Sequence, residues 1–442
     1  MRGTSVDVSQ VLFARDRRQQ LQQQILTEYQ KPLLCFTMNI AGPVKYSPLI
    51  ARGFSMGCEA LLAQLEGIAL LHQERLPRLT GCEAFFVADC DAETLKRLTV
   101  ELEEASPLGR LFDLDVTDET GRTLSRSADR RCLLCSNSAR VCGRSRTHSV
   151  QQLQEKTESI LREAVREELA RRISAKAAEA LLLEVCTTPK PGLVDRENSG
   201  SHLDMDIFTF LSSTAVLQPY FADCVKAGFD LADPARCFAR LRFLGKQALP
   251  QMLAATKGIN THKGAIFTLG LLCGAAGQLH ESEAITPEAL LSRVATLCEG
   301  LCQRDLAGVT IENARTAGQK LYAEFGITGV RGQAEQGYPA ILHTGLPVLE
   351  EGIALGYSLE RSGCAALLAM LTAAADTNMI ARSDRDTARR ITREVALLLA
   401  RDRYPDADKL RALDSVFTEA NLSPGGSADL LAATYFIHLL KA

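Results

Sequence analysis

Apolar and polar positions along the chain follow two patterns, one before about residue 150 and one after it. In the first part, KPLLCFTMNIAG (31–42) and CEAFFVADCD (82–91) are short apolar runs that predict buried strands. FSMGCEALLAQLEGIALLHQE (54–74) has apolar residues at helical spacing and predicts a helix. LGRLFDLDVTDETGRTLS (108–125) predicts a strand, a turn at Asp118–Gly121 and a returning strand. We therefore expect an α+β domain over residues 1–150.

The second part has helical patterning almost to its end. SVQQLQEKTESILREAVREELARRISAKAAEALLLEV (149–185) is rich in strong helix formers and nearly free of breakers. Further apolar segments of helix length follow, separated by connections that carry Gly and Pro. Strand signals are scarce, so residues 151–442 are expected to form a larger all-α helical domain. We place the boundary in RSRTHSVQQL, where no flexible linker rich in Ser and Gly occurs.

Length, charge and composition restrict the class of protein. The 442 residues suffice for two or three domains with sizeable cores. A net charge of −3 argues against a general nucleic-acid binder, and no apolar run is long enough to predict a membrane-spanning helix. The polar start, MRGTSVDVSQVLFARDRRQQ, lacks the apolar segment of a secretory signal. We expect a cytoplasmic protein with mostly reduced cysteines and with neither nucleic acid nor membrane as a partner.

The stretch CTTPKPGLVDRENSGSHLDMD (186–206) concentrates polar chemistry between two predicted helices. Pro189 and Pro191 exclude helix, so Lys190 is held on a stiff turn. Asp204 and Asp206 are two residues apart, and an extended segment would point both to one side, as suits Mg²⁺ and substrate phosphates. The alternative is that one of them caps the next helix. The stretch also contains Asp195, Asn198 and His202.

Four later segments are similarly rich in polar groups beside predicted helices: GINTHKGAIF (258–267), GITGVRGQAEQGYP (326–339), ADTNMIAR (375–382) and NLSPGGSADLLAA (421–433). Each alone could be a turn or a helix cap. Together they suggest a site for a polyphosphate substrate, because helix N-termini and cations bind phosphate. The candidate residues in them are Asn260, Thr261, His262, Lys263, Arg331, Glu335, Asp376, Asn378, Arg382, Ser423, Gly425 and Gly426.

The helical part resembles the triphosphoribosyl-dephospho-CoA synthase family over about residues 160–440, in five motifs in the right order: TPKPGLVDRENSGSHLDMD, GINTHKGAIF, GVRGQAEQG, DTNMIAR and SPGGSADLLA. The resemblance implies that the domain joins the ribose 2′-oxygen of 3′-dephospho-CoA to C1 of the ATP ribose and releases adenine. A carboxylate would stabilise oxocarbenium-like charge or deprotonate the 2′-hydroxyl. Mg²⁺ would position the triphosphate, with Lys190, Lys263 and Arg331 as phosphate-binding cations. The catalytic candidates are Asp195, His202, Asp204 and Asp206, and the choice of general base stays open.

In the first part, GRLFDLDV carries a second carboxylate pair. Asp113 and Asp115 alternate with Phe112, Leu114 and Val116, so in a strand both acids lie on the face opposite the apolar residues. An Asp-x-Asp strand can hold Mg²⁺ against a departing pyrophosphate. The alternative is the solvent face of an amphipathic strand.

Arginines and cysteines follow this strand. Residues 122–146 carry seven arginines and a single aspartate, Asp129, which indicates either a solvated loop face or a site for phosphates or an acidic partner protein. RRCLLCSNSARVCGRSRTH (130–148) also supplies potential zinc ligands, but their spacing fits no common zinc pattern. We therefore prefer reduced structural cysteines, with zinc as the secondary interpretation. The potential ligands are Cys132, Cys135, Cys142 and His148.

GRLFDLDV and RRCLLCSNSARVCGRSRTH resemble the apo-citrate lyase phosphoribosyl-dephospho-CoA transferase family, also called citrate lyase holo-[acyl-carrier-protein] synthase, over about residues 5–150. The resemblance implies a nucleotidyltransferase-like domain. It would transfer phosphoribosyl-dephospho-CoA to a serine of the citrate lyase acyl carrier protein (the γ subunit) and release pyrophosphate. Asp113 and Asp115 would hold the metal. The cations facing triphosphate or the carrier would be Arg110, Arg130, Arg131, Arg140, Arg144 and Arg146.

The two resemblances describe consecutive steps, in which the second part makes the precursor and the first part uses it. One alternative is the equivalent pair of enzymes for malonate decarboxylase, although the CLLC…RSRTH segment favours citrate lyase. Another is a non-catalytic helical protein that binds nucleotides or serves as a scaffold. The sequence does not determine the oligomeric state, the relative orientation of the two parts, or whether the intermediate passes directly between them.

Overall fold

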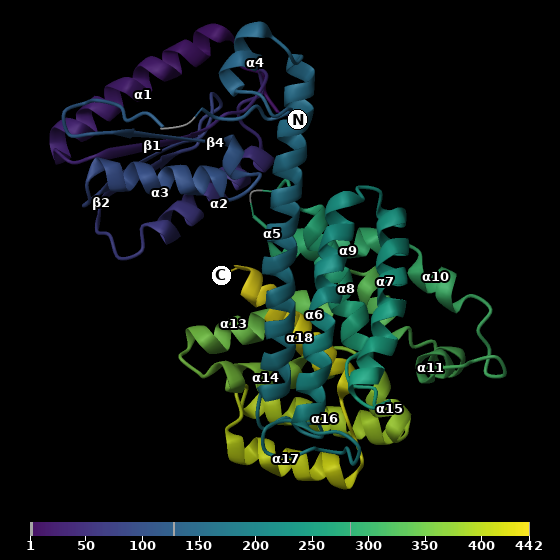
Figure 1. Cartoon of the computed structure of the whole chain (residues 1–442). Coiled ribbons are helices and arrows are strands. Elements are labelled where there is room, and N and C mark those ends of the chain that lie inside the picture. Colours follow the sequence, from purple (N-terminus) through teal and green to yellow (C-terminus); the bar gives the residue numbers. More distant parts are fainter. Residues whose placement is uncertain (1–2, 127–128, 283, 442) are drawn as a thin grey trace. The chain divides into compact units, whose positions relative to one another are not determined.

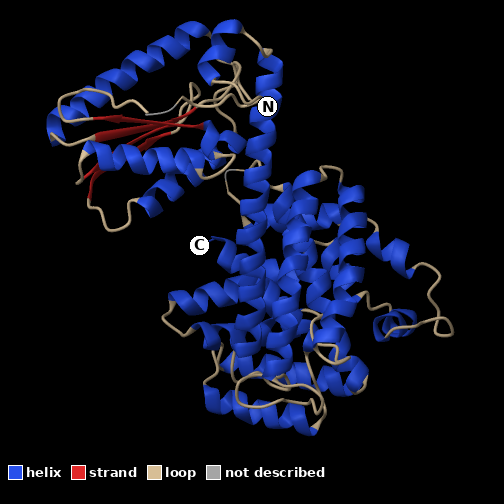
Figure 2. Cartoon of the chain, viewed as in Figure 1, coloured by secondary structure: helices blue, strands red, loops and turns tan. Residues whose placement is uncertain are grey.

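The computed structural model describes residues 3–126, 129–282 and 284–441 and divides the chain into two compact units (Figure 1). The units comprise residues 1–168 and 169–442, and the division falls inside the long helix α5 (Val150–Cys186). This helix confirms the prediction made for residues 149–185. The four strands of the described residues all lie in the first unit, and the described part of the second unit is built of helices and loops (Figure 2). The α+β and helical classes are thus confirmed.

The sheet of the first unit is antiparallel and has the strand order β2-β3-β1-β4. The predicted strands at 31–42 and 82–91 are confirmed as β1 and β3, which pair with each other. β4 pairs with β1, which places Asp113 opposite Thr37 and Asp115 opposite Cys35. The strands are β1 (Leu33–Met38), β2 (Leu70–Leu76), β3 (Glu83–Ala88) and β4 (Phe112–Thr117).

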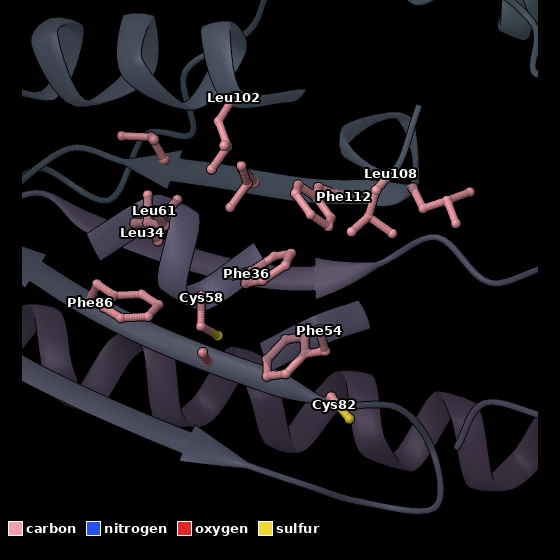
Figure 3. Packing of buried hydrophobic residues seen from close by; sticks show 14 of the residues in the cluster. Leu34, Phe36, Phe54, Cys58, Leu61, Cys82, Phe86, Leu102, Leu108 and Phe112 are labelled. Atoms are coloured by element: carbon pink, nitrogen blue, oxygen red, sulfur yellow. The ribbon is translucent and has the colours of Figure 1, made fainter. Parts of the chain in front are cut away.

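Helices cover both faces of the sheet (Figure 1). α1 (Val8–Tyr29) packs on one face, and α2 (Pro48–Gln64) and α3 (Ala92–Glu104) pack on the other. Figure 3 shows the core on the α2 and α3 side, where the Phe36 ring stacks on Phe54 at 4.7 Å between centroids and meets Phe112 edge-on at 5.1 Å. Each buried phenylalanine contributes about 1.5–3 kcal/mol. The remaining short helices of this unit are η1 (Gly109–Leu111) and α4 (Ala139–Ser145).

Two local predictions in the first unit are wrong. The helix expected over 54–74 ends at Gln64, because Gly67 has a φ of 86° and Leu70–Leu76 forms a strand against β3. The turn at Asp118–Gly121 is confirmed by a 2.9 Å hydrogen bond from Gly121 N to Asp118 O. No returning strand follows it among the described residues beyond a single bridge between Thr117 and Thr123, since residues 121–125 are largely exposed and offer no apolar face.

In the second unit α6, α7, α9 and α18 pack around α8, whose residues 265–277 are almost all buried. α6 lies directly against α8: a Cβ on Gly228 would sit 1.9 Å from the carbonyl oxygen of Gly274, so only glycine permits this contact. None of the helices in the described ranges has the length and hydropathy needed to cross a membrane. The helices are α6 (Ile207–Asp230), α7 (Pro234–Ala255), α8 (Lys263–Gln278), α9 (Pro287–Leu297), α10 (Leu301–Leu306), α11 (Ala317–Phe325), α12 (Gly329–Glu335), the π-helix η2 (Ile341–Gly345), α13 (Leu346–Ala354), α14 (Leu359–Ala373), α15 (Thr377–Arg382), α16 (Arg385–Arg401), α17 (Ala407–Glu419) and α18 (Gly425–Lys441).

Candidate functional site

The polar segments of the second unit meet around one cavity of about 840 Å³. This volume lies within the range of small-molecule sites. Segments that are far apart in the sequence contribute to its wall, including the loop before α6, the start of α8, α12, α15 and the start of α18. The sequence-predicted residues that line it are Lys190, His202, Asp204, Asn260, Thr261, His262, Lys263, Arg331, Asn378, Arg382, Ser423, Gly425 and Gly426, together with Asp376.

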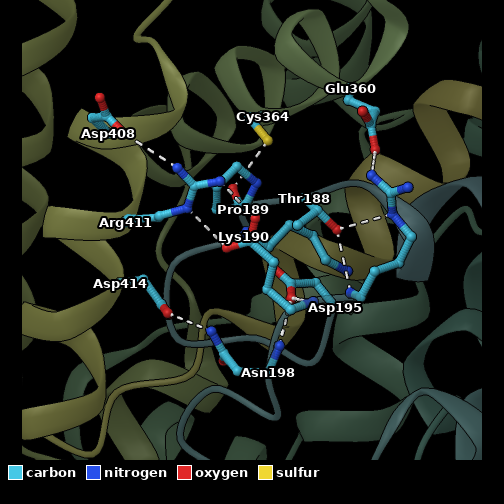
Figure 4. A network of polar contacts seen from close by, with 12 residues as sticks. Thr188, Pro189, Lys190, Asp195, Asn198, Glu360, Cys364, Asp408, Arg411 and Asp414 are labelled. Atoms are coloured by element: carbon cyan, nitrogen blue, oxygen red, sulfur yellow. Dashed lines mark hydrogen bonds and ion pairs between the residues drawn. The ribbon is translucent and has the colours of Figure 1, made fainter.

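The loop after α5 owes its shape to a network of polar contacts (Figure 4). The buried Asp195 carboxylate accepts hydrogen bonds from the backbone N–H groups of Lys190 (2.8 Å), Glu197 (2.7 Å) and Asn198 (3.0 Å). The Asn198 side chain donates to Asp414 on α17 at 2.9 Å. Neither Asp195 nor Asn198 lines the cavity. Both therefore hold the loop in place, Asp195 from a buried position and Asn198 at the surface.

The carboxylates of Asp204 and Asp206 have different environments. Asp204 is exposed and lines the cavity. Asp206 is outside the cavity lining and caps α6, where it accepts from Thr209 N at 2.9 Å and from Thr209 Oγ1 at 2.7 Å. The helix-cap interpretation therefore describes Asp206, and the structure does not bring the two carboxylates together at the cavity.

Cations around the cavity differ in their pairing. Lys190 is buried and forms an ion pair with Glu184, and Arg331 pairs with Asp305 at 3.1 Å. Lys263 is exposed and, within the described ranges, has no ion pair, so it remains available to an anionic ligand. Glu335 lies outside the lining and accepts a 3.3 Å hydrogen bond from Cys302 N.

His262 presents an unpaired nitrogen in this region. Its Nδ1 lies 2.7 Å from Ser213 Oγ, which in turn accepts a hydrogen bond from Thr261 Oγ1 at 2.8 Å. The Ser213 hydroxyl can therefore donate to Nδ1, which leaves the ring proton on Nε2. Nε2 is buried and has no hydrogen-bond partner among the described residues. Burial, followed by the charge of Lys190, lowers the pKa of His262 to about 3, so the ring is neutral near pH 7.

His202 stands beside the start of α18. Its Nε2 lies 2.8 Å from Ser423 Oγ. Burial and the neighbouring Arg382 lower the pKa of His202, and Asp204 opposes that shift. The imidazole is thus held close to the candidate carboxylate, and its neutral form is favoured.

Asp376 ties α15 to the start of α18. One carboxylate oxygen caps α15 through Asn378 N and Met379 N, both at 3.0 Å. The other accepts from Ser427 N at 2.7 Å and from Ser427 Oγ at 2.9 Å. A Cβ on Gly426 would lie 3.1 Å from this carboxylate, so the glycine permits the close approach. The N-terminus of α18 is therefore fixed at the cavity wall, with the Ser427 N–H already bound to the Asp376 carboxylate.

Sequence reasoning missed three acidic residues that line the cavity: Glu184 on α5, Asp305 on α10 and Asp429 on α18. Burial raises the pKa of Glu184, and Lys190 opposes this shift. Burial also raises the pKa of Asp429, with the charges of Glu184 and Asp376 adding to the effect. A detectable signal was present for Glu184 and Asp429, because each is a single carboxylate within an apolar helical run, LLLEVC and SADLLAA.

In the first unit, Asp113 and Asp115 lie on the same face of β4, opposite the buried Phe112, Leu114 and Val116. Desolvation, followed by repulsion from Asp113, raises the pKa of Asp115. Two carboxylates whose charges repel one another fit a divalent cation, which would relieve that repulsion. The predicted alternation along this strand is confirmed.

Arginines from the following segment lie next to β4. Arg130 donates to the carbonyl oxygen of Phe112 at 2.6 Å, pairs with Glu103, and lies 4.0 Å from Asp113 Oδ1. Arg110 donates to the carbonyl oxygen of Arg131. Arg144 and Arg146 are exposed, at the end of α4 and just beyond it. The same segment brings four potential metal ligands together: the donor atoms of Cys132, Cys135, Cys142 and His148 all lie within 4.8 Å of one another.

The chain matches two family models, one for each part. Residues 6–164 match apo-citrate lyase phosphoribosyl-dephospho-CoA transferase, and residues 170–442 match ATP:dephospho-CoA triphosphoribosyl transferase. Protein CitXG of Haemophilus influenzae is 37% identical over 456 residues, which cover 98% of this chain and 96% of that protein. The chain belongs to the CitXG family.

Other relatives agree with this assignment. Protein CitXG of Leuconostoc mesenteroides subsp. cremoris is 30% identical over 98% of this chain and 97% of its own length. The 2-(5''-triphosphoribosyl)-3'-dephosphocoenzyme-A synthase of Pectobacterium atrosepticum is 40% identical over 60% of this chain and 88% of its own length.

As a member of the CitXG family, the chain is a transferase with two activities, which synthesise the prosthetic group of citrate lyase and attach it. The order of the two parts and the citrate lyase interpretation are confirmed.

Proposed function

We propose that the cavity of the second unit binds ATP together with 3′-dephospho-CoA and forms 2′-(5″-triphosphoribosyl)-3′-dephospho-CoA. The observation that carries this proposal is the convergence of five polar segments on one cavity, in the part that matches the triphosphoribosyl transferase model. The cavity offers cations for phosphates, carboxylates for a developing positive charge, and a neutral histidine N–H. These are the groups that transfer of a ribosyl unit from a nucleoside triphosphate requires.

In this reaction the bond between C1 of the ATP ribose and adenine breaks, and a bond from C1 to the 2′-oxygen of dephospho-CoA forms. Asp204, an exposed carboxylate of the lining, would take the proton of the 2′-hydroxyl and stabilise the positive charge at C1. Lys263 and the N-terminus of α18 would bind phosphates, and His262 Nε2–H would donate to the substrate. Mg²⁺ held at Asp204 would supply charge that screens the triphosphate.

Replacing Asp204 by alanine should abolish adenine release from ATP and dephospho-CoA, measured by chromatography of free adenine. Asp206→Ala is the matched control, because Asp206 caps α6 and does not line the cavity. Loss of the cap costs about 1 kcal/mol of stability, so this variant should release adenine at close to the original rate. Full activity in Asp204→Ala, or equal loss in both variants, would refute the assignment.

We propose that the first unit acts as a nucleotidyltransferase-like domain at the exposed face of β4. A serine hydroxyl of the acyl carrier protein, the γ subunit of citrate lyase, would attack the α-phosphorus of the triphosphoribosyl group, and pyrophosphate would leave. Mg²⁺ bound by Asp113 and Asp115 would supply the charge that stabilises the departing pyrophosphate. Arg130, next to Asp113, and the exposed arginines of α4 would bind phosphate or the acidic carrier.

Asp113→Asn should block labelling of the carrier protein and leave adenine release unchanged, because only the β4 face loses a carboxylate. Asp89→Asn is the control: Asp89 follows β3, is paired with Lys31 at 2.6 Å, and is outside the β4 face. Both activities are measured in the same reaction, by the mass of the carrier and by free adenine. Simultaneous loss of both activities in a folded Asp113→Asn protein would contradict two separate sites.

A further inference from the structure

The segment between β4 and α5 depends on few apolar contacts. Within residues 129–148 only Cys132 and Cys142 are buried, and Leu133 is half-buried against the core of the first unit. The segment nevertheless forms a defined turn, in which Cys132 N donates to Asn137 O at 2.7 Å and Arg131 bridges to Ser138. Short segments with so little buried surface commonly require an additional link, such as a metal ion.

Three thiols and one imidazole converge inside this segment. Cys135 Sγ lies 3.5 Å from Cys142 Sγ and 3.4 Å from His148 Nε2. The donor atoms of all four residues, Cys132 included, are within 4.8 Å of one another. In a tetrahedral site with Zn–S bonds of about 2.3 Å and Zn–N bonds of about 2.0–2.1 Å, the ligand atoms are about 3.8 Å (S to S) and about 3.6 Å (S to N) apart. The two measured separations are close to these values.

The backbone explains how an unusual spacing gives this arrangement. Cys132 and Cys135 lie on the turn, where Leu134 N approaches Cys132 Sγ at 3.5 Å. Cys142 lies on α4, and Arg146 then adopts a left-handed conformation with a φ of 50°. This reversal, closed by Thr147 N to Cys142 O at 3.2 Å, returns the chain so that His148 reaches Cys135. The ligands therefore come from the turn, from α4 and from the residues just before α5.

We propose that Cys132, Cys135, Cys142 and His148 bind one zinc ion in a closed structural site. Four protein ligands leave no open position for a substrate, as in structural zinc sites generally. Arg130 lies two residues before the first ligand and contacts Phe112 O, Glu103 and Asp113 on and beside β4. The ion thereby holds the arginine-rich segment next to the carboxylate pair. The zinc site itself does not rest on the proposed reactions.

The test is the zinc content of the full chain, purified with its thiols reduced and dialysed against a zinc buffer. We expect about one zinc per chain, and background levels in Cys135→Ser and Cys142→Ser. Cys90→Ser is the matched control, because Cys90 is a half-buried cysteine of the same unit outside the cluster, and its variant should keep the metal. Substitution by Co²⁺ should give the intense visible and near-ultraviolet bands of tetrahedral thiolate coordination.

Limited proteolysis of the original chain provides a second test, which does not depend on whether the cysteine variants fold correctly. Arg140, Arg144 and Arg146 are exposed, so loss of the ion should accelerate tryptic cleavage at these residues at least several-fold in the original chain treated with a zinc chelator. Added zinc should reverse the effect. The proposal is overturned by a reduced chain that binds no zinc, by unchanged zinc in Cys135→Ser, or by a Cys135–Cys142 disulfide in the freshly purified protein. Because none of these measurements uses activity, failure here is distinguishable from failure of the proposed reactions.

Discussion

Lys190 gives the most quantitative prediction about the cavity wall, namely the stability lost when its buried ion pair with Glu184 is broken. Its side chain is 1% exposed and that of its partner Glu184 is 6% exposed. Replacing Lys190 by methionine keeps the volume of the side chain but leaves a buried carboxylate without its cation. Breaking a buried pair in this way costs about 3–5 kcal/mol. We therefore expect the free energy of unfolding of the second unit to fall by that amount.

A double mutant separates loss of charge pairing from loss of packing. Glu184→Gln combined with Lys190→Met removes both charges, so the double variant should recover most of the stability that Lys190→Met alone loses. Lys176→Met is the matched control, because Lys176 pairs with Glu179 on the same helix at 2.9 Å with side chains 35% and 45% exposed. A surface pair of this kind is worth about 0–1 kcal/mol. The free energy of unfolding of Lys190→Met, of the double variant and of Lys176→Met is measured by urea unfolding followed by circular dichroism.

The pH dependence of the Lys190→Met penalty has a definite sign. Burial raises the pKa of Glu184, and removal of Lys190 takes away the charge that opposes this shift. The folded variant therefore binds a proton more tightly than the unfolded chain, so the penalty is full at high pH and shrinks as the pH falls and Glu184 becomes neutral. A Lys190→Met variant no less stable than Lys176→Met, or a penalty that grows towards acidic pH, would refute this reasoning.

Two further predictions concern ionisation at the two sites. Because the pKa of His262 is lowered to about 3, its ring does not titrate near neutrality. His262→Gln should therefore lower the rate of adenine release without changing the shape of the pH–rate profile between about pH 6 and pH 8. A change in rate near pH 6.5 that is present in the original chain and absent from the variant would contradict a neutral His262. Because the pKa of Asp115 is raised, the rate of carrier labelling should decline as the pH falls through this pKa. A higher Mg²⁺ concentration should move the decline to lower pH, because Mg²⁺ competes with the proton for the carboxylate. A decline that does not respond to Mg²⁺ would argue against a cation at β4.

Much of the architecture could be predicted because the patterns were local. The long helix α5 follows from an uninterrupted run of helix formers, and β1 and β3 follow from short apolar runs. The alternation along β4 placed both acids on one face. The segments around the cavity were recognisable because polar residues beside apolar helices are costly unless they have a function.

Other features depend on contacts between distant parts of the chain. The spacing of Asp204 and Asp206 suggested a pair, but capping of α6 takes Asp206 away from the cavity. The strand β2 could not be distinguished from a helical continuation, because its partner β3 decides its conformation. The spacing of the cysteines and His148 argued against a metal, whereas α4 and the reversal at Arg146 bring the donors together. These three features are decided by tertiary contacts, which local sequence patterns do not reveal.

The measurement that tests the central claim most directly is the mass of the citrate lyase acyl carrier protein after incubation with the chain, ATP, Mg²⁺ and 3′-dephospho-CoA. The account predicts a gain of one phosphoribosyl-dephospho-CoA group on a serine, with free adenine formed at the same time. With Asp204→Ala, the carrier should stay unmodified until purified triphosphoribosyl-dephospho-CoA is added, which should restore labelling through the β4 site. A carrier that remains unmodified with the original chain, or an Asp204→Ala variant that added intermediate cannot rescue, would contradict two separate sites acting in sequence.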